Sequence, residues 1–242
     1  MTSRTQSWFI TGTDTDVGKT VVSAALLQAA ARHGLRCAGY KPVASGSEWR
    51  PEGLRNADAV ALQAASSLAL RYQEVNPYTF AEATSPHIVS AAQGVDIDPR
   101  CLSTGLHALQ HRAQWVVVEG AGGWFTPLSR DYGFDQWVVA ERLPVILVVG
   151  VKLGCINHAL LSARAIAAAG LPLVAWVANQ IQPPGRRHAE YLATLKQGLP
   201  APCLGEIPFD PAQDSQARAA YLDLTPLLDA GGARLSLART QR

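Results

Sequence analysis

The segment WFITGTDTDVGKT, near the start of the chain, constrains the fold more than any other part of the sequence. A short apolar run ends at Gly12, a polar loop follows, and Gly18, Lys19 and Thr20 open a run of small and apolar residues that is typical of a helix. A strand, a polar loop and a helix N-terminus in this order form a phosphate-binding loop, in which backbone N–H groups and the helix dipole face the phosphates. The lysine reaches the terminal phosphates, and the threonine hydroxyl binds Mg²⁺.

The spacing of this loop departs from the usual pattern, because five residues rather than four separate Gly12 from Gly18. The alternative interpretation is a glycine-rich turn before an ordinary helix, which the strand–loop–helix context disfavours. The segment therefore predicts a site for nucleotide phosphates.

Short apolar runs alternate with longer helical patterns along the rest of the chain. Runs such as WVVVEG and VILVVG are apolar almost throughout, as strands buried on both faces are. We expect strands at residues 8–11, 37–41, 115–119, 144–150, 173–179 and 201–207, and helices at residues 19–32, 56–66, 99–112, 134–142, 157–169 and 186–197. This alternation predicts one α/β domain over residues 1–230, a P-loop NTPase-like fold with a parallel sheet and helices on both faces, followed by a flexible basic tail over residues 231–242.

Composition excludes several classes of protein. The 242 residues are 48% hydrophobic, which excludes intrinsic disorder. No run approaches the ~20 apolar residues of a membrane span, and the N-terminal apolar run is too short for a signal peptide. A net charge of +2 and tryptophans without a basic stripe argue against a nucleic-acid partner. The four scattered cysteines predict reduced thiols rather than disulfides or a zinc site, so we expect a cytoplasmic enzyme.

Three charged residues lie where the expected strands and helices meet the phosphate loop. Glu119 ends the run WVVVEG; because the carboxyl ends of parallel strands form the ligand crevice, we expect it to complete an Mg²⁺ site. From the sequence alone, two interpretations of Asp58 are equally favoured: a metal ligand, or an acidic residue stabilised at a helix N-terminus. Two interpretations of Lys41 are likewise equally favoured: a solvated lysine at a strand end, or a site residue that faces the crevice. Only four of the 21 basic residues are lysines, so a lysine inside a motif stands out as a candidate for a specific role.

Two further segments are candidates for ligand contacts. VGVKLGCINHALL runs from a strand into a helix that we expect to begin near Asn157, a good N-cap, so the amides of residues 154–157 would offer a second anion site. Asn179, after the run VAWVAN, is either a reader of a purine edge or an ordinary turn asparagine.

Taken together, these residues resemble the bacterial dethiobiotin synthetases. The resemblance covers nearly the whole chain, through FITGTDTDVGKT, AGYKPVASGS, RNADAVALQ, VNPYTFAEATSPHI, VVVEGAGGWFTPL, LPVILVVGVKLGCINHALL, WVANQIQPPGRRHAEY and LGEIPF. The extended phosphate loop, combined with YKPVASG and EGAGG, is the most specific part of it. The family uses ATP, Mg²⁺ and CO₂ to close a ureido ring on 7,8-diaminopelargonic acid, and releases ADP and phosphate.

The resemblance also implies a role for each matching residue. Lys41 and Lys19 would be catalytic, and Thr20, Asp58 and Glu119 would bind Mg²⁺. The ATP contacts would be Asp16, Val17, Gly18, Lys19, Thr20, Val21, Asp58, Glu119, Gly120, Ala121, Gly122, Asn179, Gln180, Pro208 and Phe209. The substrate contacts would be Thr15, Ser45 and Gly122, together with Gly154, Cys155, Ile156, Asn157 and Tyr191 across a homodimer interface. Gln180 stands where relatives often have Asp, and Ser215 falls near a position where some have Glu.

The reaction that the resemblance implies begins with a carbamate, formed when one substrate amine captures CO₂. The carbamate attacks the γ-phosphate of ATP, and the second amine then expels phosphate from the carbamic–phosphoric anhydride. Lys19, Lys41, Mg²⁺ and backbone N–H groups would act by positioning and by stabilising negative charge.

Two other functions share the phosphate loop. An ATP-dependent amidating ligase normally carries a glutaminase domain, for which the chain has no room. A partition or cell-division ATPase carries an additional lysine early in the loop, where this chain has Thr13, Asp14 and Thr15.

Overall fold

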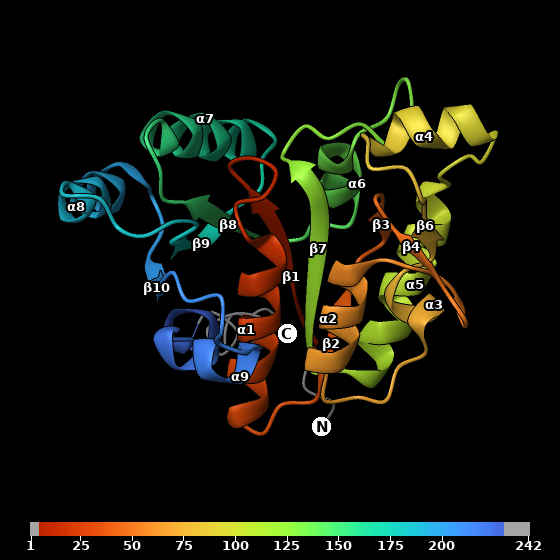
Figure 1. The fold of residues 1–242 in the computed structure, drawn as a ribbon, viewed down its shortest axis with the longest axis horizontal. Helices are drawn as coiled ribbons and strands as arrows, with labels where there is room; N and C mark the ends of the chain where they lie inside the picture. The colour runs from red at the N-terminus through yellow and green to blue at the C-terminus, as the bar shows by residue number, and fades with distance from the viewer. Residues whose placement is uncertain (1–4, 230–242) are drawn as a thin grey trace, which may run out of the picture.

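The computed structural model describes residues 5–229, so the predicted tail at residues 231–242 lies outside the described residues. Its centre is a six-stranded sheet with the order β10-β9-β8-β1-β7-β2 (Figure 1). These strands are β1 (Gln6–Gly12), β2 (Cys37–Tyr40), β7 (Trp115–Gly123), β8 (Val145–Gly150), β9 (Leu173–Asn179) and β10 (Cys203–Ile207). Every neighbouring pair is parallel, which confirms the predicted sheet.

Helices connect the strands and cover both faces of the sheet. They are α1 (Lys19–Arg32), α2 (Ala57–Ala65), α3 (Tyr72–Val75), α4 (Pro86–Gln93), α5 (Pro99–Arg112), α6 (Phe134–Ala140), α7 (Cys155–Ala168), α8 (His188–Gly198) and α9 (Ser215–Arg218), followed by a short 3₁₀ helix at Ala219–Tyr221. The helix α1 lies between α2 and α9, and α7 lies beside α8 (Figure 1).

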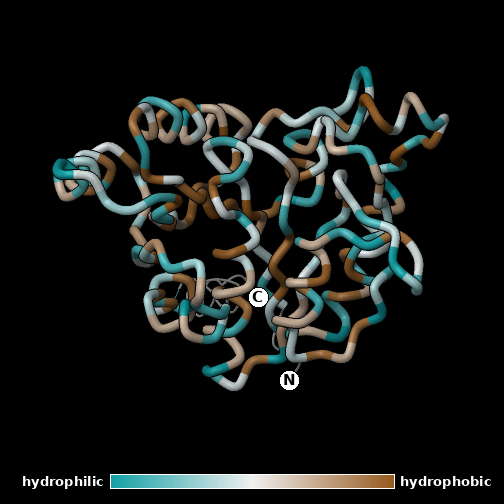
Figure 2. Tube along the Cα trace, viewed as in Figure 1, coloured by the Kyte–Doolittle hydropathy of each residue, from teal (hydrophilic) through white to brown (hydrophobic). Residues whose placement is uncertain are grey.

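Alternate residues of one central strand show the two covered faces directly. Leu147 and Val149 of β8 are buried in a cluster with residues of α7 and α8, whereas Ile146 and Val148 join the larger cluster that includes α1. All four side chains are fully buried. The apolar runs of the sequence therefore lie along the middle of the molecule, where Figure 2 shows the hydrophobic trace. Burial on both faces explains why these strands lack polar alternation.

Several predicted boundaries differ from the observed ones by one to four residues, and two of them lie at candidate site residues. Strand β7 continues to Gly123 rather than ending at Glu119, because Gly123 still pairs with Gly12 after a register shift in β1. Helix α7 begins at Cys155, and its N-cap is Gly154 rather than Asn157. Gly154 has φ 94°, a left-handed conformation that suits glycine, and this turn starts the helix before Asn157 is reached.

Four short strands lie between α1 and α5. Sequence periodicity did not predict them because each is only two or three residues long. Strands β3 (Val43–Ala44) and β6 (Tyr78–Thr79) form a parallel pair, and β4 (Glu48–Arg50) and β5 (Gly53–Arg55) form a hairpin. Among the described residues, no helix has the length and apolar character that a membrane crossing requires.

Candidate active site

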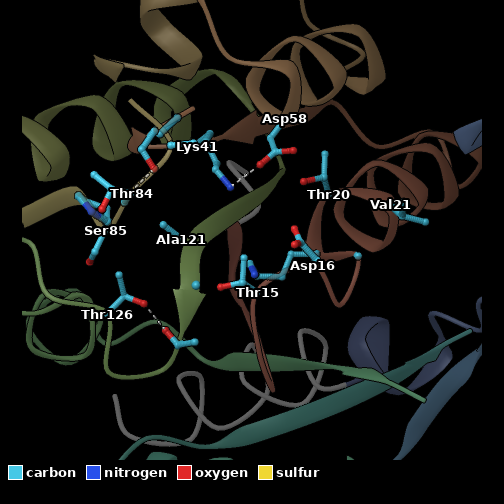
Figure 3. Close-up of a pocket in the computed structure, with 18 residues that line it drawn as sticks. Thr15, Asp16, Thr20, Val21, Lys41, Asp58, Thr84, Ser85, Ala121 and Thr126 are labelled. Carbon is cyan, nitrogen blue, oxygen red and sulfur yellow. Dashed lines mark hydrogen bonds and ion pairs between the residues drawn. The ribbon is translucent and has the colours of Figure 1, made fainter. Parts of the chain in front are cut away.

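A cavity of about 890 Å³ opens at the carboxyl edge of the sheet, beside the loop between β1 and α1 (Figure 3). The phosphate loop, the end of β7 and the segment before α4 contribute most of its walls. Its lining residues are Thr15, Asp16, Gly18, Lys19, Thr20, Val21, Lys41, Ala44, Ser45, Asp58, Ala83, Thr84, Ser85, Pro86, Ala121, Gly122, Gly123 and Thr126. The sequence-predicted phosphate loop, both predicted catalytic lysines and two of the three predicted metal ligands therefore line one cavity.

The phosphate loop ends in a glycine that no other residue could replace without strain. Gly18, the N-cap of α1, has φ 84°, and a Cβ placed there would overlap the side-chain amide of Asn179. No side chain caps α1, and its first turn contains no acidic residue. The first N–H groups of a helix have no partner within the helix, so this N-terminus is suited to an anion.

A buried lysine joins three of the predicted site residues. Lys41 Nζ lies 2.6 Å from Glu119 Oε1 and 3.0 Å from Asp58 Oδ2, and it donates a third hydrogen bond to the Gly120 carbonyl at 3.2 Å. Thr20 Oγ1 donates to the same Glu119 oxygen at 2.8 Å. Figure 3 shows Lys41, Asp58 and Thr20 on neighbouring elements around this point.

This geometry bears on the two alternatives that the sequence left open for Lys41 and Asp58. The Lys41 side chain is only 4% exposed, so it is not a solvated strand-end lysine. Asp58 does lie in the first turn of α2, where its own N–H is capped by the Asn56 side chain. Its carboxylate also accepts a hydrogen bond from Lys41, so the start of this helix contacts the lysine cluster.

The charged groups of this cluster shift one another's pKa values. Burial on its own lowers the pKa of Lys41, but the Glu119 and Asp58 carboxylates outweigh it and raise that pKa. Burial likewise opposes ionisation of Asp58, yet the adjacent Lys41 ammonium lowers the Asp58 pKa. Lys19, which donates to the Asp14 carbonyl at 3.2 Å, has its pKa lowered by burial and then by the Lys41 charge. Two cations and the Asp58 carboxylate thus line the cavity, and the buried Glu119 carboxylate lies beside Lys41 outside the lining.

The oxygen atoms of this cluster fit a divalent cation. Hydroxyl and carboxylate oxygens are the ligands that Mg²⁺ takes, usually with several waters. Glu119 is fully buried, and its Oε2 has no hydrogen-bond partner among residues 5–229. An unpaired buried carboxylate oxygen is costly, and a cation would satisfy it. Within the same residues no three His, Cys, Asp or Glu side chains gather, so a metal here would complete its shell with water or phosphate oxygens.

Three of the predicted substrate contacts, Thr15, Ser45 and Gly122, also line the cavity. Ser45 is held by a 2.7 Å hydrogen bond from its hydroxyl to the Thr84 carbonyl. The predicted set missed the residues on the far wall, which are Ala44, Ala83, Thr84, Ser85, Pro86, Gly123 and Thr126. A serine followed by proline is a helix-start signature, and at Ser85 it would have pointed to the wall before α4.

The predicted adenine contacts lie outside this cavity, at the ends of β9 and β10. Asn179 is buried and donates from Nδ2 to the Val17 carbonyl at 2.9 Å, so it supports the back of the phosphate loop. Gln180 accepts a 3.1 Å hydrogen bond from the Phe209 N–H and donates to Glu206. Gly120 and Val17 are buried and do not line the cavity, whereas Pro208 is half-buried and Phe209 is exposed.

The predicted carboxylate-binding residues do not line the cavity of their own chain. Gly154 and Asn157 are exposed, and Ile156 is half-buried. Cys155 is only 1% exposed and packs in the cluster below α7 and α8, as Tyr191 partly does, so its thiol faces the protein interior. One ion pair connects this segment to the phosphate loop, between Lys152 Nζ and Asp14 Oδ2 at 3.1 Å.

Solved structures match this fold at low sequence identity. The MinD cell division protein of Aquifex aeolicus aligns with a TM-score of 0.53 and 16% identity, and covers 98% of this chain and 96% of that one. A ParA family ATPase from Chlorobium tepidum TLS gives a TM-score of 0.52 at 13% identity, with 92% of each chain covered. These likenesses establish the P-loop ATPase fold and carry no argument about activity.

Sequence comparisons are more specific. Residues 6–217 match the family model of the AAA domain. The ATP-dependent dethiobiotin synthetase BioD of Pseudescherichia vulneris is 68% identical over 85% of both chains. BioD 1 of Salmonella typhimurium (strain LT2) is 64% identical over 92% of this chain and 98% of its own, and BioD 1 of Escherichia coli (strain K12) is 62% identical over 91% and 98%. The chain therefore belongs to the family of ATP-dependent dethiobiotin synthetases.

Proposed function

We propose that this enzyme closes the ureido ring of dethiobiotin on 7,8-diaminopelargonic acid in the cytoplasm, with CO₂ as the carbon source and ATP as the phosphoryl donor. The observation that carries the proposal is the convergence of Lys41, Asp58, Glu119 and Thr20 beside an uncapped phosphate-loop helix. A carbamate and a γ-phosphate brought together there would meet the buried lysine and the helix N-terminus at once.

The phosphate loop would bind the triphosphate of ATP. Backbone N–H groups from Asp16 to Val21 and the α1 dipole would face the phosphate oxygens, with Lys19 at the terminal phosphate. The base would lie toward Asn179, Gln180, Pro208 and Phe209, which meet at the neighbouring ends of β9 and β10. Because Asn179 also contacts the Val17 carbonyl, the base pocket and the phosphate loop share a support.

Thr20, Asp58 and Glu119 would hold Mg²⁺, which supplies charge neutralisation at the β- and γ-phosphates. This assignment rests on the orphaned Glu119 Oε2 and on the convergence of these three oxygen donors. Gly120, Ala121 and Gly122 would pass beside the nucleotide and the diamine, where the cavity lies between the phosphate loop and the far wall.

The diamine would lie between Thr15, Ser45 and Gly122. One of its amines adds to CO₂ and loses a proton, which gives a carbamate. A carbamate oxygen attacks the γ-phosphorus, and ADP leaves. The second amine then attacks the carbonyl carbon of the mixed anhydride, phosphate departs, and the loss of a proton completes the ureido ring. Lys41 and Lys19 would stabilise the anionic oxygens at each step, because a buried ammonium is pre-organised for charge that develops in the transition state.

The terminal carboxylate of the substrate would be held by a second copy of this chain. Gly154, Cys155, Ile156 and Asn157 open the 14-residue helix α7 and lie outside the cavity of their own chain. Leu153 and Leu161, beside and on this helix, are 85% and 55% exposed, which supports a covered interface there. Cys155 would contribute its backbone only, and Tyr191 would border the carboxylate site.

The test is formation of dethiobiotin from 7,8-diaminopelargonic acid, bicarbonate, ATP and Mg²⁺, followed by mass spectrometry, with each component omitted in turn. The proposal predicts product only in the complete mixture, with one ADP formed per dethiobiotin. ATP hydrolysis that does not depend on the diamine would instead support an ATPase of the kind that the fold neighbours represent.

A further inference from the structure

The ammonium of Lys41 lies between carboxylate oxygens of Asp58 and Glu119, two of the three residues proposed to hold Mg²⁺. Its Nζ is within 3.0 Å of oxygens on both Asp58 and Glu119, and the Glu119 oxygen that it contacts is the one that also accepts from Thr20. The lysine side chain is 4% exposed and that of Glu119 is 0% exposed, so little water screens this pair, whereas the Asp58 side chain is 44% exposed.

A second cation cannot share these oxygens without cost. Mg²⁺ binds oxygen at about 2.0–2.1 Å and demands near-ideal octahedral geometry. An ion on the oxygens of Thr20 and Glu119 would lie close to the Lys41 ammonium, and two cations at short range in a buried site repel each other. Either the metal or the ammonium can hold the carboxylate pair, but both together would repel.

The cavity offers space for a displaced Lys41 side chain. Lys41 lines the cavity into which the phosphates and the diamine are proposed to bind, together with Lys19, Thr15 and Ser45. An ammonium that leaves Asp58 and Glu119 therefore enters the space where negative charge develops during the reaction.

We propose that Lys41 and the divalent cation are alternative occupants of the Asp58–Glu119 carboxylate pair, and that metal binding releases the lysine into the cavity. This inference rests on the proposed function, because it uses the Mg²⁺ ligands assigned there. Without a metal, the Lys41 ammonium neutralises the Asp58 and Glu119 carboxylates. When the metal–nucleotide complex binds, the metal takes over this role.

The small number of lysines makes the exchange observable by NMR. The chain contains Lys19, Lys41, Lys152 and Lys196 only, so protein with ¹³Cε-labelled lysine gives four side-chain signals. The Lys41 signal is assigned from Lys41→Arg or, if that variant does not fold, by elimination with Lys→Arg variants at the other three positions. Spectra are compared for wild-type protein with EDTA, with a non-hydrolysable ATP analogue and EDTA, and with the analogue and Mg²⁺.

The proposal predicts that the Lys41 signal moves when Mg²⁺ is added to the analogue complex, while Lys196, exposed on α8, stays in place. A Lys41 signal that moves with the analogue alone and does not move further with Mg²⁺ would contradict it, since the phosphate and not the metal would then draw the lysine. An unchanged Lys41 signal in all three states would contradict it as well, and would mean that metal binds through the free Glu119 Oε2 while the lysine stays on its partners.

Metal affinity gives an independent readout. Mn²⁺ binding to the analogue complex, counted by electron paramagnetic resonance, should tighten about tenfold or more in Lys41→Met because the competing charge is gone. Lys196→Met removes the same charge far from the cavity and should leave the affinity within about twofold. Equal Mn²⁺ affinity in wild type and Lys41→Met would overturn the exchange.

Glu119→Gln separates this inference from the proposed function. If Mn²⁺ binding weakens in Glu119→Gln while Lys41 stays in place in wild type, the metal site stands and the exchange is wrong. If Mn²⁺ binding does not depend on Glu119, the metal assignment itself is wrong. The proposed exchange between Lys41 and the metal is then wrong as well.

Discussion

The side-chain amide of Asn179 donates a 2.9 Å hydrogen bond to the carbonyl oxygen of Val17, so the last residue of β9 supports the back of the phosphate loop. The same amide occupies the space into which a side chain at Gly18 would project. One asparagine therefore fixes the shape of the loop and excludes any side chain at its glycine.

This contact predicts the effect of a change at Gly18. Gly18→Ala must adopt a left-handed φ of 84°, at a cost of about 1–2 kcal/mol, and must also displace the Asn179 amide. We expect ATP to bind at least tenfold more weakly, as measured by calorimetry, while circular dichroism stays near wild type. Gly34→Ala is the matched control, because Gly34 also has a positive φ but its Cβ would meet nothing within 4 Å. Equal ATP affinity in both variants would refute the steric argument.

Glu119→Gln tests the metal assignment through turnover. The amide keeps the size of the side chain but removes the charge that would attract Mg²⁺, so half-maximal activity should require at least about tenfold more Mg²⁺. Asp135→Asn, at the start of α6 and outside the cavity lining, controls for the loss of one carboxylate. An unchanged Mg²⁺ dependence in Glu119→Gln would remove this residue from the metal shell.

Lys41→Ala separates ATP binding from chemistry. Lys19 and the loop amides would still bind the triphosphate, so the affinity for ATP should change only a few-fold. Dethiobiotin formation should fall by about a hundredfold to a thousandfold, the usual loss when one pre-organised donor to a developing anion is removed. Lys196→Ala on the exposed side of α8 should behave as wild type. Near-normal synthesis by Lys41→Ala would show that the lysine serves only to neutralise the Glu119 and Asp58 carboxylates.

Mixed dimers test whether two chains share each active site. One variant carries Lys41→Ala, and a second carries a bulky substitution at the α7 N-terminus, Gly154→Trp. Each homodimer should be inactive, because both of its sites carry the defect. In the heterodimer one site receives both defects and the other receives neither, so mixing the two variants with subunit exchange should restore activity. Heterodimers that are shown to form, yet stay inactive, would place each site within a single chain.

The sequence predicted the strands and helices of the sheet because their signals are local. The phosphate loop, the runs WVVVEG and VILVVG, the apolar helix α1 and the amphipathic helix α5 all lie where residue pattern placed them. The pairing of Lys41 with Asp58 and Glu119 could not be read from the sequence, since these residues come from three separate elements and meet only when β2 and β7 become neighbours. The short β3–β6 pair and the wall at Thr84 and Ser85 were missed because two-residue strands and irregular segments carry no periodicity.

In the proposed reaction a carbamate oxygen takes the γ-phosphate of ATP, and isotope labelling can follow that oxygen into the products. Wild-type enzyme is incubated briefly with ¹⁸O-labelled bicarbonate, 7,8-diaminopelargonic acid, ATP and Mg²⁺, before the label exchanges with water. The carbamate oxygen that attacks phosphorus leaves with the phosphate, so we expect dethiobiotin together with inorganic phosphate that carries one ¹⁸O atom. Dethiobiotin accompanied by unlabelled phosphate, or ADP formed without dethiobiotin, would contradict it.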